Sequence, residues 1–166
     1  FQLIAAMNPC PCGHRGDNNG KSCSCTQDQV SRYLSRISGP LLDRIDMHIE
    51  VPRLSASSLI QQAPTTEHSS DLIRLRVEKC RLRQLNRSGQ PNADLSGDQL
   101  QQSCKLSPAS RQLIERAMDK LNLSARAYHR ILRLSRTIAD MADTDDIENS
   151  HLSEAIGYRT LDRQRC

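Results

Sequence analysis

Aromatic residues are almost absent from this sequence of 166 residues, in which they make up 2%, with one Phe and no Trp. The core must therefore be built from Leu, Ile, Val, Met and Ala, as in small helical bundles. The sequence also lacks a run of the roughly 18 apolar residues that a membrane span needs. It shows no charged start, apolar stretch and cleavage site of the kind found in signal peptides. We therefore expect a cytoplasmic protein without a membrane partner.

Charge and cysteine content narrow the class further. The net charge is +4 with an isoelectric point near 8.8, which suits a polyanionic partner without requiring one. Arginine outnumbers lysine, and its planar fork favours bidentate contacts with phosphate or carboxylate groups. Seven cysteines, four of them in two close pairs, fit a metal site in a reducing compartment better than a disulfide framework.

The first third of the chain has the pattern of an α/β layer. The apolar run FQLIAAM (1–7) predicts a buried strand of the kind found in parallel sheets, and a loop rich in Gly, Asn and Cys follows it. Thr26 is placed to cap a helix over 27–38, which Gly39-Pro40 would end. The alternating MHIEV (47–51) predicts a short strand.

The remainder of the chain is predicted to be helical. Residues 54–68 are rich in Ser, Gln and Thr and predict a linker. Helices are expected after caps at Ser69 or Ser70, at Ser107 with Pro108 in the first turn, and at Ser124, and a last helix carries Leu152, Ala155 and Ile156. Their inward stripes are expected at Ile73, Val77 and Cys80, at Leu113, Ile114, Ala117 and Leu121, and at Tyr128, Ile131, Ser135 and Ile138.

Two C-x-C pairs carry the strongest chemical signal. Cys10 and Cys12 are separated by ten residues from Cys23 and Cys25, and the Gly- and Asn-rich loop between the pairs can fold back on itself. Four thiolates brought together in this way suit a tetrahedral Zn²⁺ site, in which His14 could replace one cysteine. Thiols without a metal and redox-active pairs remain alternatives, because C-x-C is less specific than C-x-x-C.

Asn8 and Arg44 stand at positions where two interpretations compete. Asn8 ends the first predicted strand, where it could orient a water or a phosphate oxygen, or simply begin a turn before Pro9. Arg44 follows a Pro-Leu-Leu anchor in SGPLLDRID and lies between Asp43 and Asp46. It could form a surface salt bridge at a helix end, or be held so that it reaches a phosphate.

Two further basic groups lie on the predicted helices. Arg126 follows the Ser124 cap, where free N–H groups favour an anion, and shares a face with Arg130 and Arg133. That face could equally be a solvated basic surface. A second set spreads around its helix without interleaved aromatic residues, and so fits a solvated helix better than a nucleic-acid surface: Arg74, Arg76, Lys79, Arg81, Arg83 and Arg87.

Four blocks of sequence, in this order, resemble the C-terminal part of the ComM/YifB family of bacterial magnesium-chelatase-like AAA+ ATPases. The resemblance extends over nearly the whole chain, and the blocks that carry it are LIAAMNPCPCG, CTQDQVSRYLSRISGPLLDRIDMHIEVP, LSARAYHRILRLSRTIADM and HLSEAIGYRTLDR. The resemblance implies a mostly α chain in which residues 1–53 form the C-terminal edge of an AAA+ α/β core. Residues 54–68 would then be a linker, and 69–166 a helical lid domain of the magnesium-chelatase C-terminal type.

The resemblance also implies roles for three residues. Asn8 matches the sensor-1 position, which helps to place the attacking water, and Arg126 matches sensor 2 at the start of a lid helix. Arg44 matches the arginine finger, offered to ATP with Mg²⁺ in a neighbouring subunit of a homo-hexamer. The family further implies DNA helicase or branch-migration activity during natural transformation, so that DNA would be a partner.

Two alternatives and one departure accompany this interpretation. A metal-chelatase motor subunit shares the same motifs, and a zinc-stapled nucleic-acid-binding module would account for the cysteines alone. The chain contains no G-x-x-x-x-G-K-[ST] motif and no apolar strand that ends in paired acids. It begins without Met, so we expect a fragment whose nucleotide-binding motifs lie upstream and which is inactive alone.

Overall fold

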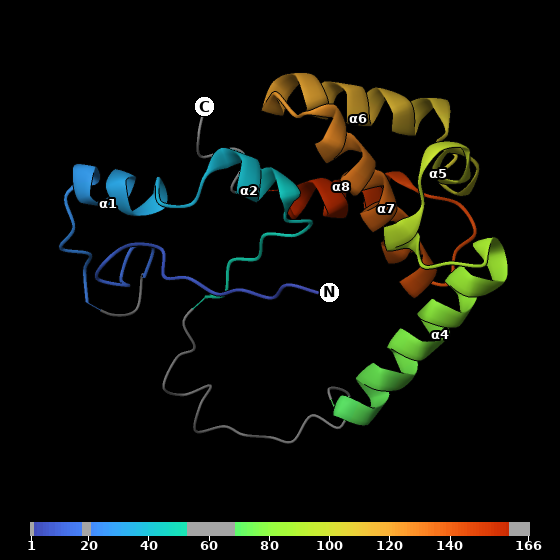
Figure 1. The fold of residues 1–166 in the computed structure, drawn as a ribbon, viewed down its shortest axis with the longest axis horizontal. Helices are drawn as coiled ribbons and strands as arrows, with labels where there is room; N and C mark the ends of the chain where they lie inside the picture. Colours follow the sequence, from blue (N-terminus) through green and yellow to red (C-terminus); the bar gives the residue numbers. More distant parts are fainter. Residues whose placement is uncertain (1, 18–20, 53–68, 160–166) are drawn as a thin grey trace. The chain divides into compact units, whose positions relative to one another are not determined.

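The computed structural model of the chain describes residues 2–17, 21–52 and 69–159 (Figure 1). These residues divide into two compact units, one formed by residues 2–42 and 50–52 and the other by residues 43–49 and 69–159. The described part is mostly α-helical and contains no β-strand. None of its helices combines the length and hydropathy that a membrane crossing requires. The predicted linker over 54–68 lies outside the described residues.

The first unit contains α1 (Gln27–Leu34), which begins as the sequence predicts but ends earlier. Thr26 and Gln29 form a capping box, in which each side chain accepts a hydrogen bond from the other residue's backbone N–H. The helix ends at Leu34, not at residue 38. Gly39-Pro40 then begins α2 (Gly39–Arg44) where we expected a stop, because proline fits the first helical turn, where its missing N–H has no intrahelical partner.

Both predicted strands are wrong for the described residues. Residues 2–7 and 47–51 have no regular secondary structure, and Leu3 and Ile4 are 63% and 86% exposed. A strand forms only where its backbone N–H and C=O groups find a partner strand, and the described residues provide none. The apolar run therefore indicates a sheet position without forming a sheet here.

The second unit, called the helical unit below, consists of residues 43–49 and a set of helices. Its side-chain caps at Ser69, Ser107 and Ser124 are confirmed: each hydroxyl accepts a hydrogen bond from a backbone N–H in the first turn. Gly89 ends the first of these helices with a φ of 71°, a backbone conformation that favours glycine. The elements are α4 (Ser70–Ser88), η2 (Asn92–Asp94), α5 (Gly97–Ser103), α6 (Pro108–Leu121), α7 (Ala125–Met141) and α8 (Asn149–Gly157).

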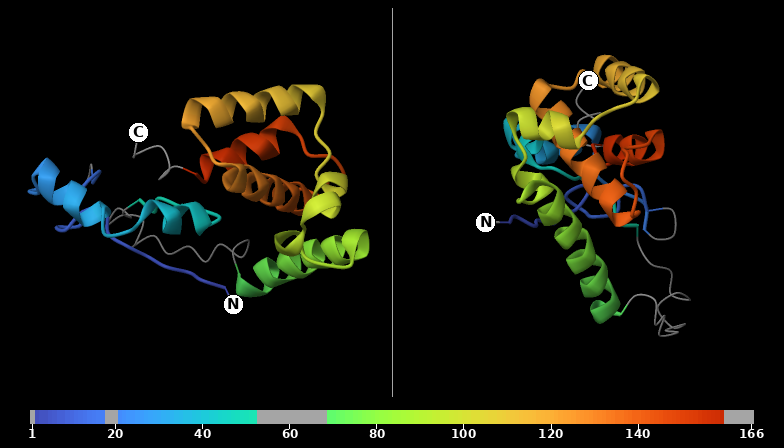
Figure 2. Two further views of the ribbon diagram at one scale, coloured as in Figure 1. Left: turned by 45° about the horizontal axis from the view of Figure 1, so that its top comes forward. Right: turned by 90° about the vertical axis from the view of Figure 1, so that its right-hand side faces the viewer.

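Helix α7 organises the helical unit. It contacts α4, η2, α5 and α8, and α6 packs on α8 (Figures 1 and 2). The core that these helices enclose is aliphatic, as the shortage of aromatic residues predicts. The inward stripes predicted for α6, α7 and α8 are confirmed, since their members are buried or pack against this core: Leu113, Ile114, Ala117, Leu121, Tyr128, Ile131, Ser135, Ile138, Leu152, Ala155 and Ile156.

The stripe predicted for α4 is only partly correct. Cys80 is buried, but Ile73 and Val77 are 47% and 55% exposed. The other buried residue of α4 is Gln84, whose amide oxygen accepts a hydrogen bond from the backbone N–H of Asn92. Helix α4 is thus held largely by polar contacts, which a pattern of apolar spacing does not reveal.

Asp140 is the centre of those polar contacts. Its side chain is fully buried, and both carboxylate oxygens accept hydrogen bonds from Arg87, at 2.6 and 2.7 Å. Asn92 donates a further bond at 2.8 Å, and the buried guanidinium of Arg136 lies at 3.2 Å. Burial raises the pKa of Asp140, but these donors outweigh burial and hold its pKa below the usual range. The carboxylate is therefore ionised at neutral pH and joins α4, η2 and α7.

We expect Asp140→Asn to destabilise the helical unit by about 3–5 kcal/mol, the usual cost of removing one partner from a buried ion pair. The contribution of Asp140 is present at neutral pH and is lost as the pH falls below about 4 through the lowered pKa of the folded state. Urea denaturation of wild type and variant at pH 7 measures the difference. The matched control is Asp145→Asn, whose side chain is 96% exposed and pairs with Arg83, and which should cost about 0–1 kcal/mol. Equal effects of the two substitutions would contradict this assignment.

Candidate functional site

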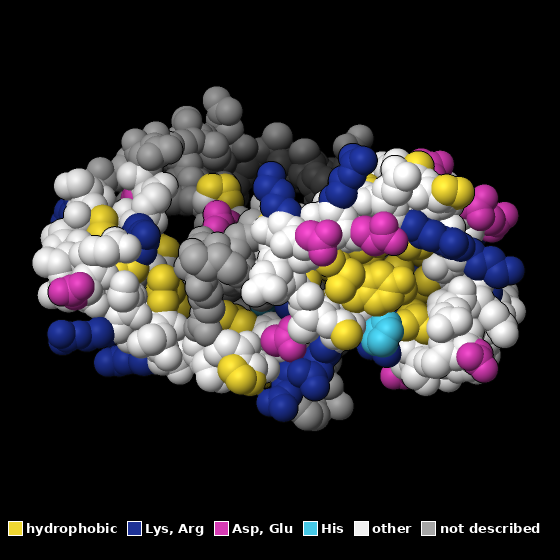
Figure 3. Space-filling view, turned by 90° about the horizontal axis from the view of Figure 1, so that it is seen from above, with side chains coloured by type: hydrophobic (Ala, Val, Ile, Leu, Met, Phe, Trp, Pro, Cys, Tyr) yellow, Lys and Arg dark blue, Asp and Glu magenta, His cyan; other side chains and the backbone are white. Residues whose placement is uncertain are grey.

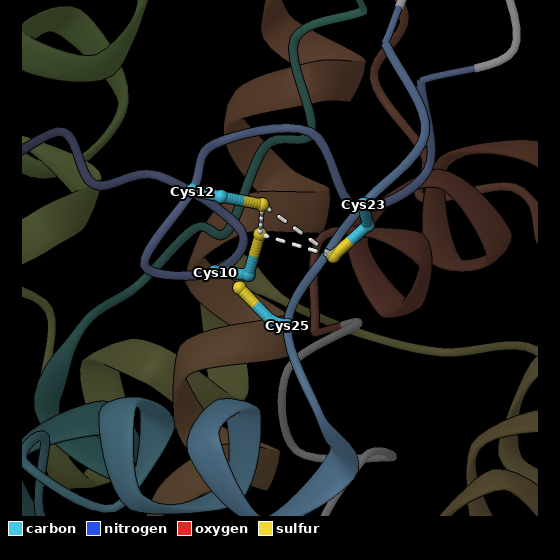
Figure 4. Close-up of side chains that lie close together, drawn as sticks. All are labelled: Cys10, Cys12, Cys23 and Cys25. Atoms are coloured by element: carbon cyan, nitrogen blue, oxygen red, sulfur yellow. Dashed lines mark hydrogen bonds between the residues drawn. The ribbon is translucent and has the colours of Figure 1, made fainter.

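The four paired cysteines converge on one point in the first unit (Figure 4). Their sulfur atoms all lie within 4.8 Å of one another. The Sγ of Cys10 lies 3.3 Å from that of Cys12 and 3.7 Å from that of Cys23, while Cys12 and Cys23 are 3.5 Å apart. A tetrahedral zinc site with bonds of about 2.3 Å has sulfur–sulfur edges of about 3.8 Å. The cluster therefore has close to the dimensions of a four-thiolate metal site.

The thiols also affect one another's ionisation. A hydrogen bond from the backbone of His14, with support from neighbouring thiols, lowers the pKa of Cys12 to about 5. For Cys25, a backbone hydrogen bond from Cys12 lowers the pKa, but the neighbouring thiols and burial outweigh it and raise the pKa to about 12. The cluster thus favours the ionisation of Cys10 and Cys12, whose pKa values are lowered, and opposes that of Cys23 and Cys25, whose pKa values are raised, because like charges at short range repel. A bound divalent cation would remove that repulsion.

The backbone around the cysteines is a series of tight turns. Gly13 donates its N–H to the carbonyl of Cys10 at 3.0 Å, and its φ is 80°. His14 does not join the cluster: its Nδ1 lies 3.9 Å from the carboxylate of Asp17. Asn8 is exposed, and a Cβ placed on Gly13 would lie 3.8 Å from its amide group. The loop thus gathers the thiols and places Asn8 beside the first cysteine turn.

Arg44 is exposed at the end of α2, and among the described residues its side chain has no hydrogen bond or ion pair. The two carboxylates that flank it in sequence are engaged elsewhere. Asp43 contacts Ser124 and Arg126, and Asp46 pairs with Arg130. Within the described part of the chain, Arg44 therefore forms no salt bridge with the two acids that flank it in SGPLLDRID.

The anion-binding groups at the start of α7 contact a side chain of the same chain, the carboxylate of Asp43. The hydroxyl of Ser124 accepts the Ala127 N–H and donates to Asp43 Oδ1 at 3.0 Å, while Arg126 lies 3.2 Å from Oδ2. Burial raises the pKa of Asp43, but these two hydrogen bonds and the charge of Arg126 outweigh it and lower the pKa. Arg126 remains 58% exposed, so its guanidinium keeps donors for a second partner.

Several other basic residues of the predicted faces are also engaged. Arg130 pairs with Asp46, and Arg133 donates to the carbonyl of Leu95 at 2.8 Å, so the face with Arg126 is not simply solvated. On α4, three of the predicted basic residues bind acids of α7 and of the loop after it: Lys79, Arg83 and Arg87. Basic and acidic side chains are interspersed on the face seen in Figure 3, which shows no single basic field.

Sequence reasoning missed one residue that shapes this site. Arg159 follows α8 and is fully buried; it donates to the carbonyl of Ile45 and lies 3.8 Å from Asp43. Ile45 and Asp43 are 114 and 116 residues away from it in the sequence. The Asp43–Arg126 contact joins residues 83 apart. The only available signal was the presence of two acids beside Arg44 and several arginines in later helices.

Of the predicted site residues, the four cysteines come together in the first unit. Arg44 and Arg126 both belong to the helical unit, where Asp43 contacts Arg126 and is adjacent to Arg44 in the chain. Asn8 belongs to the first unit. The described residues thus contain two candidate sites, one in each unit. The first is the thiol cluster. The second is residues 43–49, which we call the arginine segment.

Comparison with known proteins identifies the family. Residues 1–59 match the model of the magnesium chelatase subunit ChlI, and residues 67–159 match the model of its C-terminal region. Over 98% of the chain, the sequence is 45% identical to competence protein ComM of Haemophilus influenzae and 41% identical to the uncharacterized protein YifB of Escherichia coli. An uncharacterized protein of Mycobacterium tuberculosis is 30% identical over 99% of the chain.

The chain spans about a third of the length of these relatives, 31% for ComM and YifB. The matches to the two models together cover both units, and the match to the C-terminal model alone extends over more than half of the chain. The chain therefore belongs to the magnesium chelatase subunit ChlI family, with ComM and YifB among its relatives.

Proposed function

We propose that this chain supplies an arginine finger, Arg44, to a ring-forming AAA+ ATPase that acts on DNA. The observation that carries the proposal is the state of Arg44: exposed, without a partner among the described residues, and flanked by two acids that bind other groups. Such an arginine is free to reach a phosphate outside its own chain. Its planar fork suits phosphate oxygens better than a lysine would.

The architecture proposed with this function follows the family. By sequence, residues 1–53 belong to the C-terminal edge of an AAA+ core, residues 54–68 connect, and residues 69–166 form the lid. Within this division, residues 43–49 pack with the described lid helices. The caps of the described lid helices and their aliphatic core support a lid that folds as one unit.

Three side chains take part in nucleotide chemistry in this proposal. Asn8 orients the water that attacks ATP, and Arg126 contacts the nucleotide from the start of α7. Arg44 neutralises charge on the phosphoryl group as it is transferred, in the site of a neighbouring subunit of a homo-hexamer. Mg²⁺ bound with ATP supplies further charge neutralisation. The exposed guanidinium of Arg126 and the amide of Asn8 are accessible for these contacts.

The DNA substrate is proposed from the relative named competence protein ComM. We infer that the full-length protein couples ATP hydrolysis to helicase or branch-migration activity on DNA taken up during natural transformation. The DNA-contacting residues are not assigned to this chain, because three of the six basic side chains of α4 bind acids of α7 and of the loop after it, within the helical unit.

The test is the ATPase rate of the full-length protein with and without a four-way DNA junction. We expect the junction to raise turnover several-fold over a linear duplex of equal length. A rate that no DNA changes would contradict the DNA assignment. The second candidate, a chelatase motor, is favoured by the ChlI model match, and predicts stimulation by Mg²⁺ with a porphyrin in the presence of its partner subunits.

We also propose that Cys10, Cys12, Cys23 and Cys25 bind Zn²⁺, which would staple a loop whose buried apolar content is small. The near-tetrahedral sulfur distances support this. A third candidate, a nucleic-acid-binding module without catalysis, would use the same zinc loop. It predicts salt-sensitive DNA binding by the 166 residues alone, and no such binding at low salt would exclude it.

A further inference from the structure

The arginine segment, residues 43–49, is fastened to the helical unit at two places. At the first, the carboxylate of Asp43 accepts from Ser124 and Arg126 at the start of α7, and Asp46 pairs with Arg130 one turn later. Because Ser124 is also the cap of α7, the Asp43 carboxylate lies where the helix dipole favours a negative charge. The negative charges of Asp43 and Asp46 thus match the positive charges of the α7 arginines that they contact.

The second attachment is at the end of α8. The buried guanidinium of Arg159 donates to the carbonyl of Ile45 and lies 3.8 Å from Asp43 Oδ1. His48 donates its backbone N–H to the carbonyl of Tyr158 at 2.8 Å. Backbone contacts of this kind do not depend on flexible side chains at both ends. They fix the course of the chain on both sides of residue 46.

Asp43 is the residue shared by both attachments. It contacts groups of α7 and Arg159, and it directly precedes Arg44 in the chain. Its side chain is 26% exposed, so its contacts are partly shielded from solvent, unlike those of an open surface pair. The backbone of Arg44 is thereby held between an anchored Asp43 and an anchored Ile45, while its side chain extends into solvent.

We propose that Asp43 is a positioning residue that fixes Arg44 to the helical unit, so that the finger moves with the lid as one body. This inference rests on the proposed role of Arg44 and adds a regulation to it. Any rotation of the helical unit, for example on nucleotide binding, carries Arg44 toward or away from the neighbouring subunit. Lid position in one subunit then sets the hydrolysis rate in the next.

The first test uses the full-length protein with Asp43→Asn, which keeps the shape of the side chain and removes its charge. We expect kcat for ATP to fall by about 10- to 100-fold with KM unchanged, because a displaced catalytic group loses rate without losing substrate binding. Asp71→Asn is the matched control: its side chain is 86% exposed on α4 and pairs only loosely with Arg74 at 3.7 Å. It should leave kcat unchanged.

A double-mutant cycle separates this inference from the proposed function. If Asp43 acts through Arg44, then Asp43→Asn combined with Arg44→Ala should be no slower than Arg44→Ala alone. Additive losses, or a normal kcat for Asp43→Asn, would overturn the positioning role while leaving the finger intact. A normal rate for Arg44→Ala would overturn the proposed function itself.

Hydrogen exchange of the 166-residue chain gives a readout without activity. We expect Asp43→Asn to speed the exchange of the His48 N–H, which bonds Tyr158, while amides in the middle of α7 keep their protection. Unchanged exchange at His48 would show that the segment does not depend on Asp43. A loss of protection throughout α7 would show that Asp43 stabilises the whole unit and does not specifically position Arg44.

Discussion

Replacing Arg44 with alanine in the full-length ATPase is expected to lower ATP turnover by about 10³-fold or more, the usual contribution of an arginine finger. The side chain has no partner among the described residues whose loss would unfold the chain, so stability should change little. Nucleotide affinity should also change little, because the finger acts mainly on charge that develops during phosphoryl transfer. Single-turnover and steady-state ATPase assays measure these effects.

Two further variants sharpen this prediction. Arg44→Lys keeps the charge but loses the planar fork, so its turnover should lie between those of wild type and Arg44→Ala. Arg76→Ala removes another exposed arginine, from α4, and should leave turnover unchanged. If Arg44→Ala hydrolysed ATP at the wild-type rate, the finger assignment would be wrong. If Arg76→Ala were equally slow, the loss would reflect surface charge alone.

The second large effect concerns the thiol cluster. The protein should carry about one equivalent of zinc per chain, because four thiolates at these distances complete a tetrahedral site. Cys10→Ser should lose most of this metal, since Cys10 is fully buried at the centre of the cluster. Amides of residues 8–25 should then exchange faster, because the loop has few buried apolar side chains to hold it.

The control for the metal prediction is Cys80→Ser. Cys80 belongs to the helical unit, where it is buried on α4 and accepts a hydrogen bond from Gln84. The Cys80→Ser protein should therefore keep the full zinc content of the wild type. Less than half an equivalent in the wild type, with no difference between the two variants, would contradict the zinc assignment. Metal analysis of protein purified without chelators gives the answer.

The helices of the second unit could be predicted because their signals are local. Ser69, Ser107 and Ser124 cap helices through backbone groups three residues away, and Gly89 ends α4 in a conformation that favours glycine. The apolar spacing of α7 likewise requires only one turn of context. Such features depend on neighbours in the sequence, which are always present.

The strands could not be predicted correctly because, unlike a helix cap, a strand depends on residues that are distant in the sequence. A run such as residues 2–7 shows that the backbone is suited to a sheet, but the sheet itself needs partner strands from elsewhere in the sequence. The described residues provide no partner strand for this run, and Leu3 and Ile4 are therefore exposed. The sequence thus indicates that residues 2–7 suit a β-sheet, but the described residues contain no such sheet.

The candidate sites show the same difference between contacts that are local in the sequence and contacts that join distant residues. The cysteine spacing predicted the thiol cluster because only a short loop separates the pairs. The contacts of Asp43 with Arg126 and of Arg159 with Ile45 join residues 83 and 114 apart, so no local pattern indicates them. The buried Asp140 and Arg136 were missed because charged residues at helical spacing usually face solvent.

Mixed rings test most directly whether Arg44 serves a neighbouring subunit. Full-length protein that carries Arg44→Ala can be mixed with a variant that has Arg44 but cannot bind ATP, each being inactive alone. Where the two meet, an intact nucleotide site faces an intact arginine, and we predict that ATP hydrolysis returns in proportion to mixing. If the mixture stays as inactive as its components while mixed rings demonstrably form, Arg44 does not act across the interface and the account is wrong.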